Sequence, residues 1–303
     1  MPQKVILDVD TGCDDAVAML LAGHHPALEL VAALPVHGNA PLADTLENTL
    51  RLLSAGKLEH VPVYVGAENP LIGPVIAGHG DQIVKLPFEN KGIKPQPQHA
   101  VNFLIEYYMS GKGDNTIYMP VGPLTNLALA LRIEPRLAKK IPSIVTMGGA
   151  YLLGNTNPSA EFNILADPEA AQIAYSAGIP IRMVGLEVCE LADIEPKDSD
   201  AIRANGTPWA SVAADIIDIV IGLQSKWLGK PSALIYDAVA VAAVVEPDIM
   251  QTKPMHVEIE LTGTHTRGRT VADGRLRTGP ANVDVGVGFN RARFLEILRE
   301  GLK

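Results

Sequence analysis

Four aspartates fall within eight residues near the start of the chain: Asp8, Asp10, Asp14 and Asp15. They follow a short apolar run at residues 5–7 and surround the turn residues Thr11 and Gly12. Each carboxylate raises the pKa of its neighbours and resists removal from water, so the cluster is unfavourable unless a cation neutralises it. Because the candidate ligands are oxygen atoms rather than His or Cys, the expected ion is hard, either calcium or magnesium.

The surrounding sequence alternates between apolar runs of strand length and amphipathic segments of helix length. The predicted strands are 5–10, 30–36, 61–65, 116–121, 143–147 and 181–184, and the predicted helices are 14–23, 41–54, 98–110, 124–133 and 168–177. After residue 206 the pattern is mainly helical up to residue 247. It then predicts strands at 256–261 and 283–289 and a closing helix from residue 290.

This order predicts an α/β fold with a doubly wound, mostly parallel sheet, a Rossmann-like core flanked by helices. No linker, repeat or low-complexity segment interrupts it, so residues 1–303 are predicted to form a single domain. Ligands of such sheets bind beyond the carboxyl ends of the strands. The aspartate cluster, Asn39, residues 121–122 and residues 148–149 should therefore converge at one edge.

Composition narrows the class of partner. With 303 residues, of which 47% are hydrophobic, the chain can bury a large core. Its net charge of −9 disfavours nucleic acids and anionic membranes and favours small molecules. No apolar run approaches the ~20 residues of a membrane span. The two cysteines make no disulfide framework and no apolar signal-like stretch follows Met1, so a cytoplasmic location is expected.

Several common catalytic motifs are missing from the sequence. It has no Gly-rich dinucleotide loop after a strand, no phosphate-binding loop ending in Gly-Lys-Ser/Thr, no paired-histidine zinc motif and no serine nucleophile elbow. Nucleotide-binding, zinc-protease and serine-hydrolase functions therefore lose support.

Residues 8–16 resemble the N-terminal signature of the inosine-uridine-preferring nucleoside hydrolases, Asp-x-Asp-x-Gly-x-Asp-Asp-Ala after a strand. Further matches follow in the order and spacing of that family at 37–39, 120–126, 147–149, Asn155, 161–163, 167–170, 237–240 and 270–273. The resemblance covers essentially the whole chain. It implies the nucleoside hydrolase fold, a homodimer or homotetramer, and a role in nucleoside salvage or catabolism.

The resemblance also implies the reaction. Family members hydrolyse the N-glycosidic bond of ribonucleosides to ribose and free base with a bound calcium ion. The implied ligands of Ca²⁺ are Asp10, Asp15, Asp237 and the main-chain carbonyl of Val121. Asp10 would be the general base for the attacking water, and the transition state would be oxocarbenium-like.

The resemblance implies that different residues contact different parts of the nucleoside. Asp14 and Asn39 would bind the ribose diol, while Asp237 and Asn163 would serve both binding and catalysis. The 5′-hydroxyl end would be held by Asn155, Glu161 and Asn163. Met147 and Phe162 would pack against the sugar.

The chain departs from this family pattern at two places that would meet the base. Several members carry His where this chain has Tyr236, and a phenol with an unperturbed pKa of ~10 is a poor general acid at neutral pH. Tyr236 or Trp227 could instead stack on the base. The second departure comes directly after His79, a residue that is assigned to the substrate site. There the chain lacks the glycine-containing run that the family pattern leads us to expect. Preference for purine or pyrimidine bases stays open.

Two other functions remain as alternatives. A catalytically silent nucleoside or ribose binder would keep the ion site but lack leaving-group chemistry at Tyr236. A phosphohydrolase of the haloacid-dehalogenase type would use Asp8 as its nucleophile, but it leaves Asp14 and Asp15 unexplained and finds no downstream partner motif.

Four residues near the motifs are expected to be structural. Asp8 should pair with a buried backbone donor rather than a metal, and His37 should aim the loop that carries Asn39. Cys13 should fill a tight turn, although a thiol at a helix N-terminus can be reactive. Cys189 either borders the pocket or is a buried neutral thiol.

Overall fold

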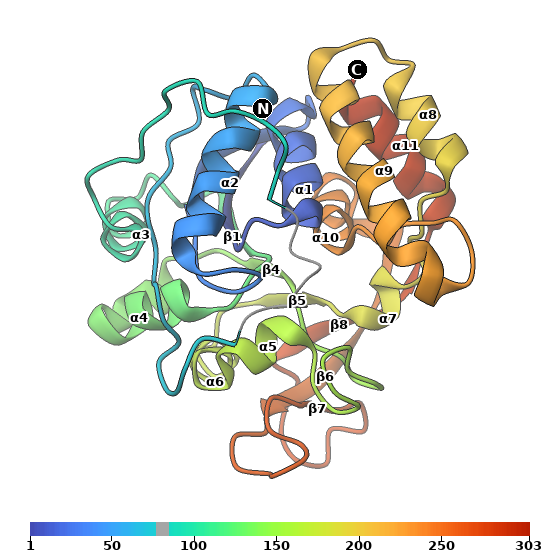
Figure 1. The fold of residues 1–303 in the computed structure, drawn as a ribbon. Helices are drawn as coiled ribbons and strands as arrows, with labels where there is room; N and C mark the ends of the chain where they lie inside the picture. Colours follow the sequence, from blue (N-terminus) through green and yellow to red (C-terminus); the bar gives the residue numbers. More distant parts are fainter. Residues whose placement is uncertain (77–84) are drawn as a thin grey trace.

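The structure is a computed structural model that describes residues 1–76 and 85–303 (Figure 1). The substrate-site prediction at His79 lies outside these residues. An eight-stranded sheet runs through the described part in the order β2-β1-β3-β4-β5-β8-β6-β7. The strands are β1 (Gln3–Val9), β2 (Leu28–Pro35), β3 (Thr116–Pro120), β4 (Ile144–Met147), β5 (Ile181–Val184), β6 (Met250–Ile259), β7 (Thr270–Asp273) and β8 (Val283–Phe289).

The sheet is parallel from β2 to β8 and antiparallel only where β6 and β7 extend it. The α-helices are α1 (Cys13–His24), α2 (Leu42–Ala55), α3 (Ala100–Met109), α4 (Thr125–Ile133), α5 (Phe162–Ala166), α6 (Pro168–Tyr175), α7 (Leu186–Cys189), α8 (Pro196–Arg203), α9 (Pro208–Leu228), α10 (Tyr236–Val245) and α11 (Arg291–Gly301). This arrangement confirms the predicted mostly parallel α/β fold.

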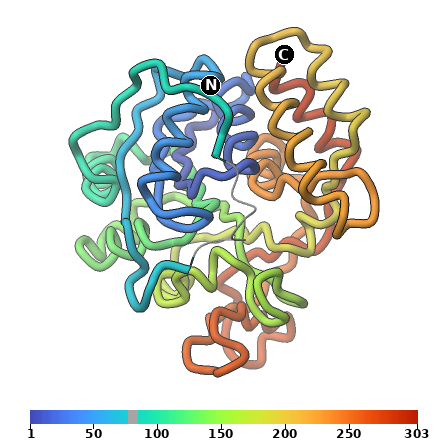
Figure 2. Tube along the Cα trace, viewed as in Figure 1, coloured from blue at the N-terminus to red at the C-terminus, as the bar shows by residue number. Residues whose placement is uncertain are grey.

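Two apolar clusters make up the core. One contains buried residues of α1, α2, α9, α10 and α11, and the other contains buried residues of α3, α4 and α6. Strand β1 supplies both, because Val5 and Leu7 belong to the first and Ile6 to the second. Figure 2 shows the C-terminal helix α11 close to α8, on the side of the molecule where both chain ends lie.

Strand β1 delivers the acidic cluster to the edge of the sheet. Val5, Ile6 and Leu7 are completely buried, as expected for a central parallel strand covered on both faces. The strand ends at Val9, so Asp10 is the first residue beyond it. Helix α1 begins at Cys13, which places Asp14 and Asp15 in its first turn, where the helix dipole favours negative charge.

The predicted strand at residues 61–65 is wrong. This segment makes only an isolated parallel bridge between Ala33 and Val63, followed by a second between Tyr64 and Gln96. Pro62 has no N–H to donate, so a regular ladder along β2 cannot be completed there. The backbone instead makes separate hydrogen bonds, from Ala33 N to Pro62 O at 3.1 Å and from Tyr64 N to Ala33 O at 3.1 Å.

The antiparallel extension was only partly predicted. Strand β6 begins at Met250, six residues before the predicted start, because its first half is exposed and polar and lacks an apolar alternation. Strand β7 was not predicted. It pairs antiparallel with β6, with Thr270 opposite Ile259.

Among the described residues, no helix combines the length and apolar character needed to cross a bilayer.

Candidate active site

A cavity of about 460 Å³ opens beyond the carboxyl ends of β1, β3 and β4. Of the predicted site residues that the structure describes, all but Asp15 line it: Asp10, Asp14, Asn39, Val121, Met147, Asn155, Glu161, Phe162, Asn163, Trp227, Tyr236 and Asp237. Segments far apart in the sequence therefore meet at the edge of the sheet, where ligands of doubly wound folds bind.

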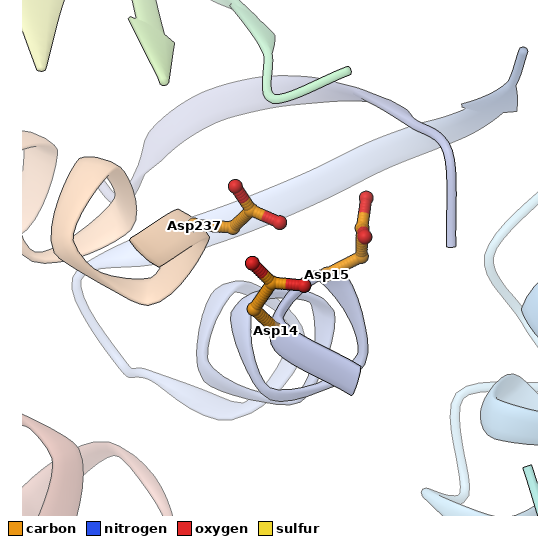
Figure 3. A group of neighbouring side chains, drawn as sticks. All are labelled: Asp14, Asp15 and Asp237. Atoms are coloured by element: carbon orange, nitrogen blue, oxygen red, sulfur yellow. The ribbon is translucent and has the colours of Figure 1, made fainter. Parts of the chain in front are cut away.

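Three carboxylates point toward one another at the floor of this region (Figure 3). Asp14 and Asp15 come from the first turn of α1 and Asp237 from the first turn of α10, and one carboxylate oxygen of each lies within 4.8 Å of the others. The resemblance had implied Asp10 as the third carboxylate ligand and Asp14 as a ribose contact. The geometry brings Asp14 as close to the other two as a shared cation would require.

Asp10 is buried beside this group with a fixed orientation. Its carboxylate Oδ2 accepts a hydrogen bond from the backbone N–H of Asn39 at 2.7 Å, and its own N–H donates to Asp15 Oδ1 at 3.0 Å. The second Asp15 oxygen accepts from Gly12 N at 2.9 Å. The Asp15 carboxylate is thus held by the backbone of the turn that joins β1 to α1, and the Asp10 carboxylate by the backbone of the turn after β2.

Two glycines make room for the Asp10 carboxylate. A Cβ atom added at Gly38 would lie 2.1 Å from Asp10 Oδ2, and one added at Gly122 would lie 2.8 Å from Asp10 Oδ1. Both distances are shorter than non-bonded atoms tolerate. Both glycines lie in the family motifs, but their role as the walls around Asp10 emerges only from the structure.

The electrostatics of the cluster fit a divalent cation. Burial raises the pKa of Asp15 to about 7, and the charge of Asp14 adds to this effect. Burial also raises the pKa of Asp10 and of Asp237 well above the usual range, with further contributions from the neighbouring carboxylates. No Lys, Arg or His among the described residues lines the cavity. Carboxylate and carbonyl oxygens without a protein cation are the donor set that a hard ion needs.

The Val121 carbonyl meets Asn163 at the cavity wall. Asn163 Nδ2 donates to Val121 O at 2.7 Å and to Met147 O at 3.3 Å, so it ties the end of β3 to the end of β4. A carbonyl oxygen has two lone pairs, and the bond from Asn163 leaves one of them for an ion. The contact between these two predicted site residues was not anticipated from the sequence.

Glu161 organises the loop that leads into α5 beside the cavity. It is buried and caps helix α5, with Oε1 accepting from Asn163 N at 2.9 Å and Oε2 accepting from Gly149 N at 2.9 Å. Burial raises its pKa, whereas these backbone donors lower it. Asn155 reaches the same turn, because its Oδ1 accepts from Phe162 N at 3.0 Å.

Tyr236 and Trp227 also line the cavity. Tyr236 begins α10 directly before Asp237, and burial raises the pKa of its phenol well above the ordinary value. The hydroxyl is therefore protonated at neutral pH and can donate a hydrogen bond, but it is a weak acid. Trp227 lies near the end of α9 with 56% of its surface exposed.

Several residues that line the cavity were not named individually from the sequence. They are Glu190, Val220, Leu223, Gln224 and Leu234. Four of these have the apolar or amphipathic character of ordinary helix and loop positions, so no local signal marks them. Glu190 follows the short helix α7 after β5, and its position at a strand end was the available clue.

Asp8 is structural, although its partners differ from the prediction. It is completely buried and accepts hydrogen bonds from the Tyr118 hydroxyl and from Asn126 Nδ2 at 3.0 Å. These are side chains rather than a backbone donor. Asp8 does not line the cavity, and burial raises its pKa to about 7. A carboxylate that is buried and accepts two hydrogen bonds in this way is unsuited to be the phosphoryl acceptor of a phosphohydrolase.

His37 is held as a structural residue. Its Nε2 bonds Thr125 Oγ1 at 3.0 Å, and that hydroxyl donates to Asp167 Oδ2 at 2.7 Å. Burial lowers the pKa of His37 to about 4, so the ring is neutral at physiological pH. This series of hydrogen bonds anchors the turn from which the backbone N–H of Asn39 reaches Asp10.

Neither cysteine has the environment of a reactive thiol. Burial, followed by the charges of Asp14 and Asp15, raises the pKa of Cys13 to about 12. Cys189 is completely buried, and burial raises its pKa well above the usual value. Since the thiolate is the nucleophile, burial disfavours the reactive form of both side chains.

Known proteins resemble this chain over its whole length. The family model of the inosine-uridine preferring nucleoside hydrolases matches residues 5–296. A pyrimidine-specific ribonucleoside hydrolase, RihB, from Escherichia coli O9:H4 (strain HS) is 38% identical over 304 residues, covering 98% of this chain and 96% of the relative. The RihB of Shigella flexneri serotype 5b (strain 8401) is 37% identical with the same coverage.

Solved structures agree with this relationship. A purine-preferring ribonucleoside hydrolase from Gardnerella vaginalis has a TM-score of 0.89 and 30% identity, over 99% of this chain and 98% of that one. A plant nucleoside hydrolase, the PpNRh1 enzyme, also has a TM-score of 0.89, with 28% identity over 100% of this chain and 99% of that one. The chain therefore belongs to the inosine-uridine preferring nucleoside hydrolase family and is a hydrolase that acts on N-glycosyl compounds.

Proposed function

We propose that the protein hydrolyses the N-glycosidic bond of ribonucleosides to ribose and free base with one bound calcium ion. The observation that carries this proposal is the position of the carboxylate cluster. Asp10, Asp14 and Asp237 open into the same cavity as Asn155, Glu161 and Asn163, which are suited to hold the hydroxyl groups of a sugar. A nucleoside bound between them would place its glycosidic bond next to the acidic floor.

The ion would be held by Asp10, Asp15, Asp237 and the carbonyl oxygen of Val121. Asp14 is close enough to Asp15 and Asp237 to contribute a further oxygen or to meet a ribose hydroxyl. Calcium accepts six to eight oxygen ligands in flexible geometry, which leaves room for substrate oxygens. When bound, calcium would supply Lewis-acid activation of the attacking water and orientation of the ribose diol.

Asp10 would take the proton from the attacking water. Its carboxylate is buried and fixed by the Asn39 N–H and by the close approach of Gly38 and Gly122. A bound cation beside this group would favour its ionised form, which is the form that can accept a proton. Rigid placement also keeps the base aligned with the bond that breaks.

The remaining side chains would stabilise the sugar as positive charge grows on it. Asp14 and Asn39 would bind the diol, while Asn155, Glu161 and Asn163 would hold the 5′-hydroxyl end. The acidic wall stabilises an oxocarbenium-like ring electrostatically. Met147 and Phe162 would pack against the ring and exclude water. Hydroxyl contacts that tighten in the transition state raise kcat.

Replacing Asn163 tests the sugar-binding part. Asn163→Ala removes the side chain that bonds the Val121 and Met147 carbonyls, so we expect KM for nucleosides to rise and kcat to fall by about tenfold or more. Steady-state kinetics on calcium-loaded protein measures both values. Wild-type kinetics in this variant would remove Asn163 from the site.

Replacing Tyr236 tests how the base leaves. Because burial raises the pKa of the phenol, we expect Tyr236→Phe to change kcat for purine nucleosides by less than about tenfold, with stacking retained. The measurement is kcat for inosine and adenosine in both proteins. A loss of about 10²–10⁴-fold, the range for a general acid, would instead assign proton donation to the hydroxyl.

The proposed function is tested with separate incubations of calcium-loaded protein with inosine, adenosine, guanosine, uridine and cytidine. Chromatography then quantifies free base and ribose. We expect both products in equal amounts from at least one of them, and the ratios rank the bases. Binding of a nucleoside by calorimetry without product from any of the five would favour the silent binder.

Three further statements stay predictions. We propose one domain over residues 1–303, because one sheet links the N-terminal and C-terminal halves of the described chain. The homodimer or homotetramer follows from the family resemblance, and the cytoplasmic location from cysteine use. The contact of His79 with the base also stays a prediction.

A further inference from the structure

One group of residues that line the cavity is mostly apolar. It combines the α9 residues Val220, Leu223 and Trp227 with Leu234 and Tyr236. This composition suits the faces of a nucleobase but does not distinguish one base from another. Discrimination must come from the few polar groups there.

Gln224 has little freedom to act as that polar group. Its Oε1 accepts a hydrogen bond from Leu234 N at 2.7 Å, and its Nε2 lies 3.5 Å from Leu234 O. Both ends of the amide thus hold α9 against the segment that leads into α10. Among the described lining residues, the Tyr236 hydroxyl and the Glu190 carboxylate are further polar groups.

Glu190 is carried by a firmly anchored backbone. It follows α7, whose first residue Leu186 donates its N–H to Gly149 O at 3.1 Å, and its own N–H donates to Leu186 O at 2.8 Å. The side chain is exposed and lines the cavity together with Tyr236, and Sγ of the preceding Cys189 lies 3.9 Å from Tyr236 O. In the described part of the cavity lining, no cationic side chain faces it.

An ionised carboxylate at this position accepts hydrogen bonds and donates none. Cytosine and adenine present an exocyclic amino group on the edge where uracil and hypoxanthine present a carbonyl oxygen, and glutamate is a known acceptor for such an amino group. Hydrogen bonds to a charged acceptor are the stronger class. A carbonyl oxygen opposite the same carboxylate would be repelled.

We propose that Glu190 is a specificity-determining residue that accepts a hydrogen bond from the exocyclic amino group of the base, so that cytidine is preferred over uridine and adenosine over inosine. This inference rests on the proposed function and adds its substrate class. The expected preference in kcat/KM is about tenfold to a hundredfold within each pair, the range for a hydrogen bond to a charged group.

The test compares calcium-loaded wild type with Glu190→Gln, using the pairs cytidine/uridine and adenosine/inosine. A Gln amide both donates and accepts, so the preference within each pair should fall toward one. p-Nitrophenyl β-D-riboside, whose leaving group has no N–H donor, offers Glu190 no hydrogen bond, so its cleavage by the wild type reports hydrolysis without recognition of an amino group. Glu59→Gln is the matched control, since Glu59 is exposed and outside the cavity.

The outcomes separate the two proposals. Equal or inverted wild-type preference within the pairs, or a preference that Glu190→Gln leaves unchanged, would overturn the role of Glu190 while p-nitrophenyl riboside cleavage still supports the hydrolase. A lack of cleavage of every riboside by the wild type would instead overturn the proposed function itself. Far-UV circular dichroism checks that the variant, changed at an exposed position, is folded.

Discussion

Asp10→Asn is expected to lower kcat by about 10³-fold or more at saturating calcium, because the amide cannot accept the proton of the attacking water. The substitution keeps the shape of the side chain, so the close fit against Gly38 and Gly122 and the bond from Asn39 N are retained. Loss of the base, rather than disorder of the site, is then the cause of the slow reaction.

The measurement for Asp10→Asn is ribose release together with calcium content by elemental analysis. Asp44→Asn is the matched control, since Asp44 is an exposed residue of α2 outside the cavity and should react at the wild-type rate. Near-normal turnover in the calcium-loaded Asp10→Asn protein would end the assignment of Asp10 as general base.

Asp237→Ala is expected to abolish both calcium binding and activity. Asp237 is buried, and its carboxylate approaches those of Asp14 and Asp15 from the opposite side of the site (Figure 3). Removing it takes one carboxylate from the proposed ligand set of the ion. Binding at a hundred times Kd stabilises a folded protein by about 2.7 kcal/mol, so calcium should raise the wild-type Tm by roughly 5 °C or more.

Melting curves with and without calcium, combined with elemental analysis after dialysis, test this second prediction. The Asp237→Ala protein should show no calcium-dependent change in Tm and no retained ion. The Asp44→Asn control should behave as wild type. Unchanged calcium content in Asp237→Ala would refute Asp237 as a ligand.

The sequence was informative where local pattern and structure coincide. The apolar run 5–7 predicted a buried central strand, and the turn after it placed the aspartates at a sheet edge, because parallel strands direct their carboxyl ends to one side. The helical period in the C-terminal part similarly predicted α9 and α10. Each of these elements can be predicted from the pattern of apolar residues within its own segment.

Contacts between distant segments could not be derived in the same way. Nothing in the periodicity brings Asp237 to Asp14 and Asp15; only the family resemblance linked Asp237 to the ion. The bond from Asn163 to the Val121 carbonyl depends on how α5 packs against the loop that follows β3. Strand β7 and the exposed half of β6 were not predicted for a related reason. Their pairing with neighbouring strands defines them, and an apolar pattern does not.

The most direct test of this account is restoration of activity to the metal-free protein. The wild type is stripped with a chelator, shown to be metal-free by elemental analysis, and titrated with calcium while ribose release from the best nucleoside of the panel is followed. The account predicts no release without metal and full release at one calcium ion per chain. Undiminished release from protein shown to be metal-free would contradict it.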